Sequence, residues 1–191
     1  MHDYTEGFFN RTLKLEQPSA KTAVKILSAH FKPGSVVDIG CGIGIYLKEF
    51  KKNGVEIFGV DGSHNAINKS LVGGKIRLFD LTKPLVLEKK YDLCLCIEVA
   101  EHLEEAHADT LISSLIKSCD IIIFTAATPG QGSEKIGHYN EQPHRYWIEK
   151  FSTRGFGYRK NISHKLRKEM KKGKIVWWVV KNLMVFKKYD S

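Results

Sequence analysis

A chain of 191 residues that is 42% hydrophobic and 27% charged is long enough for one sizeable globular domain with a buried core. No apolar run approaches the roughly 18 residues that would span a bilayer, and the N-terminal residues lack the basic and apolar regions of a signal peptide. These properties argue against a membrane protein or a secreted protein, and they predict a single cytoplasmic domain over residues 1–191.

The net charge of +9 is concentrated near the C-terminus. Residues 1–158 contain 19 Lys and Arg against 19 Asp and Glu, so this part of the chain is neutral. Residues 159–174 contain eight basic side chains and one acidic side chain, a local charge of +7. We interpret this stretch as a basic insertion, either a solvated helix face or a surface for an anionic partner.

The four cysteines, at positions 41, 94, 96 and 119, lie inside or beside apolar segments. This placement favours reduced thiols in a core over a disulfide framework, which agrees with a cytoplasmic location. Cys94 and Cys96 alternate with apolar residues in one run, and we therefore interpret them as core residues and not as metal ligands.

The first elements along the chain are an aromatic segment and a helix. Residues 1–18, with Tyr4, Phe8 and Phe9, show no clear periodicity and are interpreted as an N-terminal arm or a flap over a pocket. Ser19 is in a position to cap a helix whose apolar residues recur at helical spacing as far as Phe31.

Apolar strands then alternate with helical stretches. Five strands are predicted at 35–39, 55–60, 75–79, 91–97 and 120–126, a helix near 143–154, and a long final strand at 176–186. Leu111 with Leu115, and Ile112 with Ile116, mark the clearest helix between strands. This alternation predicts an α/β fold in which right-handed crossovers connect the strands of a parallel sheet covered on both faces.

Acidic residues end four successive predicted strands: Asp38, Asp61, Asp80 and Glu98. Ligands bind at the carboxyl ends of the strands in open α/β sheets, so these acids are candidate site residues. Asp38 is followed by Gly40, Gly42 and Gly44, which allow a tight turn after the first strand. A single acid at a strand end is often a helix cap or a turn residue, but four in succession favour a site.

The glycine turn differs from the dinucleotide-binding fingerprint. That fingerprint is G-x-G-x-x-G, whereas here the third glycine comes one position early, at Gly44. An acid just before the glycines suits a ligand with an ammonium group better than a pyrophosphate. The turn therefore indicates a ligand that carries positive charge.

The sequences VVDIGCGIG and GVDGS resemble the cofactor signature of class I S-adenosylmethionine-dependent methyltransferases. Asp61 comes 61 − 40 = 21 residues after the first glycine, close to the spacing of about 20 for an acid that binds ribose hydroxyls. The resemblance implies a Rossmann-like, doubly wound, mostly parallel seven-stranded sheet with an antiparallel C-terminal strand. It implies S-adenosylmethionine as the cofactor, and these cofactor-binding residues: Asp38, Gly40, Cys41, Gly42, Asp61, Gly62, Asp80, Leu81 and Glu98.

The segment CIEVAEHL contains an E-x-x-E-H pattern formed by Glu98, Glu101 and His102. The pattern resembles two metal-dependent groups, the ubiquinone-pathway O-methyltransferases and the enzymes that 2′-O-methylate the 3′ ends of small RNAs. By this resemblance Glu98, Glu101, His102 and His138 would hold a divalent ion, Mg²⁺, Mn²⁺ or Zn²⁺, beside the acceptor oxygen. Acids are also common at a helix N-terminus without any metal.

Residues 127–147 are too polar and too rich in glycine for a core connection, and they are interpreted as a substrate loop. Their P-G-Q-G…G-H-x-N-E-Q…Y-W signature resembles a branch of bacterial methyltransferases. By this likeness His138, rather than His144, is the candidate general base or additional metal ligand, and His102 is the second candidate base.

Together these patterns predict a cytoplasmic methyltransferase that acts on a hydroxyl, or an amine, of a small molecule, with no obligate protein partner. A first alternative is an RNA 2′-O-methyltransferase that uses the basic stretch, although no separate RNA-binding module is present. A second is a non-catalytic cofactor-binding subunit that docks a partner through the basic stretch and the tail around Trp177 and Trp178.

Overall fold

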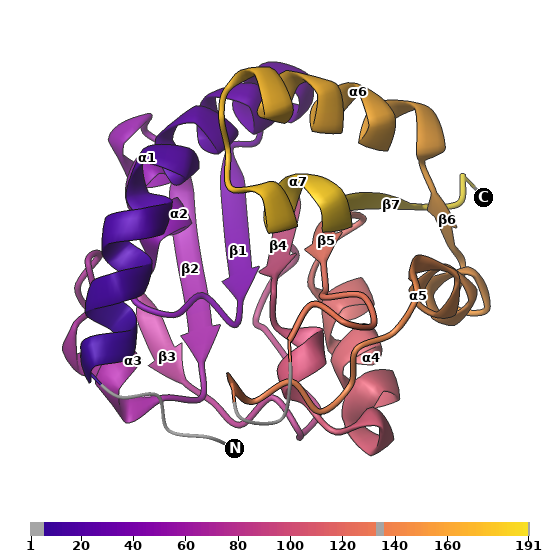
Figure 1. Cartoon of the computed structure of the whole chain (residues 1–191), viewed down its shortest axis with the longest axis horizontal. Coiled ribbons are helices and arrows are strands. Elements are labelled where there is room, and N and C mark those ends of the chain that lie inside the picture. The colour runs from indigo at the N-terminus through magenta and orange to yellow at the C-terminus, as the bar shows by residue number, and fades with distance from the viewer. Residues whose placement is uncertain (1–5, 133–135, 191) are drawn as a thin grey trace.

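The structure, a computed structural model, describes residues 6–132 and 136–190, with side chains for all of these except residues 6 and 8–12. Its sheet has seven strands in the order β3-β2-β1-β4-β5-β7-β6, and β7 runs antiparallel to its two neighbours (Figure 1). The strands are β1 (Ser35–Ile39), β2 (Glu56–Asp61), β3 (Ile76–Leu78), β4 (Leu93–Ile97), β5 (Ile121–Thr125), β6 (Phe156–Tyr158) and β7 (Met184–Lys188). The predicted fold class is confirmed.

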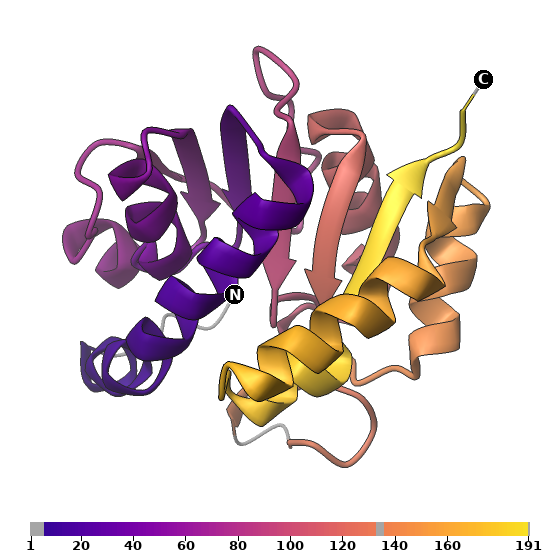
Figure 2. The same cartoon turned by 90° about the horizontal axis from the view of Figure 1, so that it is seen from above.

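Helices cover both faces of the sheet. In Figures 1 and 2, α1 and α6 lie on one side of the sheet and α4 lies on the other. The helices are α1 (Glu6–Phe31), α2 (Ile45–Lys52), α3 (His64–Asn68), α4 (Ala108–Ser118), α5 (His144–Ser152), α6 (Lys160–Lys172) and α7 (Trp177–Asn182), with two short 3-10 helices, η1 (Ala100–His102) and η2 (Glu105–His107).

Successive residues of each central strand contribute to two separate hydrophobic cores. Val36 packs with α1, α2, α6 and α7, whereas its neighbour Val37 packs with α4 and α5. Every residue of β1 is buried, as are Cys94 and Cys96 in β4, which agrees with a strand covered on both faces. Cys94, Cys96 and Cys119 are free and buried, and Cys41 is free and half-buried.

The first helix differs from the prediction. It begins at Glu6, with Pro18 inside it, and Ser19 is therefore not its cap. Ser19 is buried, and its hydroxyl oxygen accepts a hydrogen bond of 3.2 Å from the backbone N–H of Val176. Residues 6–18, expected as part of an arm, belong to this helix, and Leu13 packs against the core. Tyr4 and the side chains of Phe8 and Phe9 lie outside the described part of the chain.

The predicted strand at 176–186 is wrong over its first half. Trp177–Asn182 form α7, and the strand β7 begins at Met184. Ile175, Val179, Asn182 and Leu183 are buried, a helical spacing, whereas Trp177 is 60% exposed. The burial of one helical face therefore outweighs the strand preference of the valines and tryptophans.

The basic stretch forms most of α6, an amphipathic helix. Its buried face contains Ser163, Leu166 and Met170, and the last two belong to the core beside α1. Its five lysines are exposed, so most of the positive charge lies on the outer face. Among the described helices, none is long and apolar enough to cross a membrane.

Gly40→Ala should destabilise the fold more than Gly54→Ala. Both glycines have positive φ, 81° and 76°, where alanine is strained by about 1–2 kcal/mol. A Cβ on Gly40 would also lie 2.4 Å from Val99 Cγ2, whereas a Cβ on Gly54 meets nothing within 4 Å. Overpacking should cost Gly40→Ala about another 1–3 kcal/mol in urea unfolding. Equal losses in the two variants would contradict this account of the glycine turn.

Candidate active site

The carboxyl ends of the parallel strands bring the predicted site residues to one edge of the sheet. Asp38 lies in β1, Asp61 ends β2, Glu98 follows β4, and Asp80 lies in the loop after β3. Figure 2 shows the first half of α1 on one side of this edge, and the C-terminal part of α6 with α7 on the other. Three helices from the two ends of the chain thus border the site.

The glycine turn is held between β1 and β2. Gly40, Gly42 and Gly44 all have positive φ, and the backbone N–H groups of Gly40 and Cys41 donate to Val60 O at 2.8 and 3.1 Å. The Asp61 carboxylate accepts one hydrogen bond from Gly42 N–H at 2.7 Å and one from Ser63 N–H at 2.9 Å. The Asp61 carboxylate therefore fixes the glycine turn. Its side chain is half-buried, beside that turn.

A hollow of about 480 Å³ lies beside Asp61. It is lined by Gly62, His64, Leu78, Phe79, Asp80 and Lys83. Asp80 Oδ1 accepts hydrogen bonds from Thr82 N–H and Thr82 Oγ1 at 3.0 and 2.7 Å, and these bonds lower its pKa. Leu81 is buried just behind the hollow. The hollow thus combines apolar surface with an ionised acid at its rim.

Several acids are crowded at this edge, and within the described residues Asp38 and Glu16 form no ion pair. Burial, and then the neighbouring Asp61, raise the pKa of Asp38 to about 8. Burial, and then Glu98, raise the pKa of Glu16 on α1 to about 7. Tyr46 Oη is buried with no hydrogen-bond partner among the described residues. Burial, and then the charges of Glu16, Asp38 and Glu98, raise the pKa of Tyr46 well above its usual value. The sequence analysis missed Glu16, because residues 1–18 show no helical pattern that would place it here.

The second cluster contains Glu101, His102 and His138. The ligand atoms of these three side chains all lie within 4.8 Å of one another. The rings of His102 and His138 are 4.8 Å apart, edge to face. Glu101 is fully buried; its Oε1 accepts from Ala127 N–H at 3.1 Å, and its Oε2 has no hydrogen-bond partner. Burial and the neighbouring Glu98 raise the pKa of Glu101 well above its usual value.

Hydrogen bonds hold both histidines through Nδ1. His138 Nδ1 is 2.6 Å from Glu141 Oε1, and His102 Nδ1 is 3.0 Å from the carbonyl oxygen of Gly137. Glu141 Oε2 also accepts from Gly130 N–H at 2.7 Å. Although burial opposes it, these bonds lower the pKa of Glu141. An acid or carbonyl that fixes one ring nitrogen leaves the other directed at a site.

The loop after β5 is anchored to η1, the 3-10 helix that contains Glu101 and His102. The carbonyl oxygen of Glu101 accepts hydrogen bonds from Tyr139 N–H at 2.8 Å and Asn140 N–H at 3.1 Å. A Cβ on Gly132 would lie 2.3 Å from His138 Nδ1, so the loop passes closely over this ring. The same contacts therefore position His102 and His138 against each other, although the two residues are far apart in the sequence.

Glu98 lies beside Glu101 and also has a partner of its own, Asn182. Its φ is 53°, a conformation that costs free energy in a residue with a side chain. Its backbone N–H donates to Thr125 Oγ1 at 2.9 Å, and its carboxylate accepts from Asn182 Nδ2 at 3.1 Å. Glu98 thus belongs to the same edge but is not in the compact group of three.

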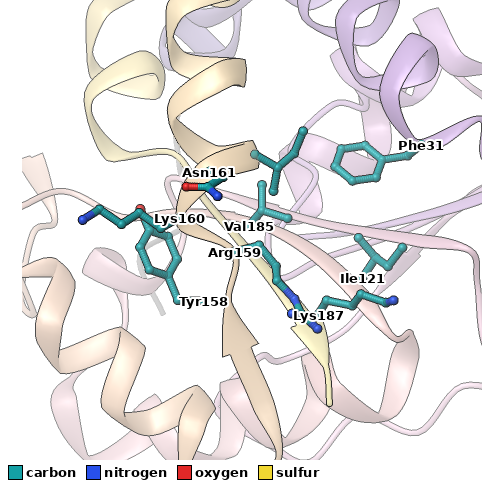
Figure 3. Close-up of a pocket in the computed structure, with 9 residues that line it drawn as sticks. Phe31, Ile121, Tyr158, Arg159, Lys160, Asn161, Val185 and Lys187 are labelled. Carbon is teal, nitrogen blue, oxygen red and sulfur yellow. The ribbon is translucent and has the colours of Figure 1, made fainter. Parts of the chain in front are cut away.

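A larger hollow, about 510 Å³, lies elsewhere in the molecule (Figure 3). It is lined by Phe31, Ile121, Tyr158, Arg159, Val185 and Lys187, among others. Ile121 begins β5 and Thr125 ends it, so this hollow lies at the opposite end of the sheet from the acids and histidines. None of the predicted site residues lines it.

Comparison with known proteins gives a family. The chain matches the model of a methyltransferase domain over residues 13–146, which is 134 of its 191 residues. A search of curated proteins finds no match.

The fold is similar to that of solved methyltransferases at low identity. A sugar N-methyltransferase from Streptoalloteichus is 11% identical, with a TM-score of 0.71 over 100% of this chain and 95% of that one. A magnesium protoporphyrin IX methyltransferase from Synechocystis, with bound S-adenosylhomocysteine, is 22% identical, with a TM-score of 0.61 over 82% and 81%. A complex of a Haloferax volcanii methyltransferase activator with a putative methyltransferase gives 13% identity and a TM-score of 0.70 over 97% and 95%.

Some matches cover less of the other protein. The chain spans 62% of the length of Streptomyces venezuelae DesVI, to which it is 14% identical with a TM-score of 0.56. The family match, the strand order and the glycine turn agree with one another. This chain belongs to the methyltransferase family and is an S-adenosylmethionine-dependent methyltransferase of class I.

Proposed function

We propose that the chain transfers the methyl group of S-adenosylmethionine to a hydroxyl group of a small molecule, with an amine as the less favoured acceptor. The observation that carries this proposal is the position of the Glu101, His102 and His138 cluster, at the same edge of the sheet as the acid-bordered glycine turn. A donor site and a group of proton acceptors thus adjoin each other.

The geometry supports the assignment of the cofactor residues. Adenine fits the hollow beside Asp80 and Leu81, and ribose hydroxyls fit the half-buried carboxylate of Asp61. The cationic end of the cofactor fits Asp38 and Glu98, which form no ion pair within the described part of the chain, against Gly40, Cys41 and Gly42. Glu16 adds a further carboxylate on this side. A positive charge placed among these acids would favour their ionised forms, and so would oppose the burial and the neighbouring charges that raise the pKa values of Asp38 and Glu16.

The reaction needs orientation and removal of a proton. The acceptor oxygen attacks the methyl carbon, the C–O bond forms, and the S–C bond breaks with its electron pair returning to sulfur. His138 is the proposed base, because Glu141 fixes its Nδ1 and can stabilise the imidazolium that forms. His102, packed against it at 4.8 Å, is the second candidate. The acceptor proton leaves through this histidine pair.

The same residues fit a divalent ion. Two histidines whose Nδ1 atoms are fixed by a carboxylate and a carbonyl, beside a buried carboxylate oxygen with no partner, form a donor set suited to Mg²⁺, Mn²⁺ or Zn²⁺. Glu101, His102 and His138 would hold the ion, with Glu98 as the fourth candidate ligand. When bound, the ion would lower the pKa of the acceptor hydroxyl.

An RNA acceptor is the second candidate function. The five exposed lysines of α6 form a basic surface, and phosphate contacts of this kind give RNA binding that weakens steeply with salt. The balanced charge of residues 1–158 favours the small-molecule acceptor. RNA binding that weakens with salt and is lost when these lysines are replaced would favour RNA.

His138→Ala should lower turnover by about 10²–10⁴-fold, because general-base catalysis contributes about that much. Affinity for S-adenosylhomocysteine, measured by calorimetry, should stay within about twofold, since the assigned cofactor residues are elsewhere. His164→Ala, an exposed histidine on α6, is the matched control and should change neither quantity. Equal loss of turnover and cofactor affinity in His138→Ala would contradict the assignment.

Cofactor affinity should depend on the ionisation of Asp38. Its pKa of about 8 means that the acid is neutral in the folded protein below this pH, while the cofactor ammonium favours the ionised form. The Kd for S-adenosylhomocysteine should therefore fall as pH rises toward 8, by at most about tenfold per pH unit, and level off above. Asp38→Asn should bind weakly and lose this dependence in calorimetric titrations. An unchanged pH profile in Asp38→Asn would exclude Asp38 as the source.

Removal of divalent ions decides whether a metal takes part. If it does, chelation followed by gel filtration should abolish most of the activity, and Mg²⁺, Mn²⁺ or Zn²⁺ should restore it. Glu101→Gln should lower the metal content measured by mass spectrometry, whereas Glu104→Gln, an exposed acid nearby, should not. Full activity in metal-free protein would exclude a role for a metal, and His138 would then act as a general base without an ion.

A further inference from the structure

Arg167 is a cation without an acidic partner among the described residues, and it contacts Leu183, the neighbour of Asn182. Arg167, on α6, donates from Nε to the carbonyl oxygen of Leu183 at 2.8 Å, and its Nη2 is buried with no hydrogen-bond partner. Within the part of the chain that the structure describes, Arg167 forms no ion pair. A partly buried guanidinium without a counter-ion is unfavourable unless a ligand supplies the negative charge.

Two further buried polar atoms without partners lie close to Arg167. Asn182 is fully buried, and while its Nδ2 donates to Glu98, its Oδ1 has no partner. Asn182 directly precedes Leu183, whose carbonyl oxygen fixes Arg167. His144, the first residue of α5, has a buried Nε2 with no partner. Burial, and then Arg167 and Lys181, lower the pKa of His144, so positive charge dominates its surroundings.

These groups are on elements that border the acceptor side of the site. α7 contributes Asn182, α6 contributes Arg167, and His144 ends the loop that begins after β5 and contains His138. Asn182 links this corner to Glu98 at the end of β4. Nearly all buried polar atoms in folded proteins have a partner, and the described residues hold ten without one. Among them, Arg167 Nη2 is a donor and His144 Nε2 can be one, so an oxyanion would satisfy both, whereas Asn182 Oδ1 can only accept.

We propose that Arg167 and His144 form an anion subsite that binds a carboxylate or phosphate group of the methyl acceptor. The acceptor is then a small hydroxylated acid, whose oxyanion pairs with the guanidinium while its hydroxyl lies toward His102 and His138. This subsite rests on the proposed function for its role in catalysis. Its chemistry, binding of an oxyanion, is measurable without any turnover.

The direct test uses the protein saturated with S-adenosylhomocysteine. It is titrated with inorganic phosphate, and separately with benzoate, against sodium chloride of equal ionic strength. Nuclear magnetic resonance follows the pKa of His144, and thermal unfolding follows stability. In wild type, phosphate or benzoate should raise both the pKa of His144 and the unfolding midpoint, because the anion offsets the charge of Arg167. A response to phosphate alone would indicate a phosphate-bearing acceptor, and a response to benzoate alone would indicate a carboxylate-bearing acceptor.

Arg167→Gln should abolish both responses, whereas Lys168→Gln, on the exposed face of the same helix, should keep them. Wild-type protein that responds to neither anion beyond chloride would overturn the proposal, and so would a full response in Arg167→Gln. If Arg167→Gln does not fold, Arg167→Lys, which keeps the charge but not the fixed fork, should show a weakened response. The wild-type titration decides in either case.

An activity assay distinguishes failure of the anion subsite from failure of the proposed function. Wild-type protein with methyl-labelled S-adenosylmethionine and a cell extract should give a labelled small product that an anion exchanger retains. Arg167→Gln should lower kcat/KM for that acceptor about 10- to 100-fold, with the KM for S-adenosylmethionine unchanged. A labelled product that is not retained would overturn the anion subsite. No labelled product at all would overturn the proposed function, while the titration still tests the subsite.

Discussion

The Asp61 carboxylate, which accepts hydrogen bonds from Gly42 N–H and Ser63 N–H, is the interaction on which the rest of the site depends. It fixes the glycine turn after β1 to the end of β2, so the two strand ends present one continuous surface. The three glycines have positive φ angles, and a Cβ on Gly40 would collide with Val99, so a larger residue does not fit this turn. Val99 in turn leads into η1, so the glycine turn and the 3-10 helix that contains Glu101 and His102 are supported together.

Electrostatics divides the edge of the sheet into two regions. Around the glycine turn, Asp61 acts on Asp38 and Glu98 acts on Glu16, so this group of acids suits a cation. On the far side of Asn182, Arg167 and Lys181 leave an excess of positive charge that suits an anion. A cationic methyl donor and an anionic acceptor would each find complementary charge, with the Glu101, His102 and His138 cluster at the same edge.

Much of the fold was predictable from the sequence because its signals are local. The buried β-branched run, the glycine spacing and the acids at strand ends gave the sheet, its class and the residues of the glycine turn. The elements that failed depend on distant contacts: Ser19 is buried under Val176, and Trp177–Asn182 are helical because their buried positions face α6 and the sheet. Glu16, Asn182 and Arg167 carry no local signal, since only the packing of α1, α6 and α7 brings them to the site. His102 and His138 had motif signals, but their contact required the fold.

A crystal structure of the protein with S-adenosylhomocysteine tests the central claim most directly. We expect adenine in the hollow between Gly62 and Lys83, ribose hydroxyls on Asp61, and the amino group among Asp38 and Glu98, with sulfur facing the His102 and His138 pair. Sulfur directed away from these histidines, or the ligand in the hollow around Arg159 and Lys187, would contradict the account.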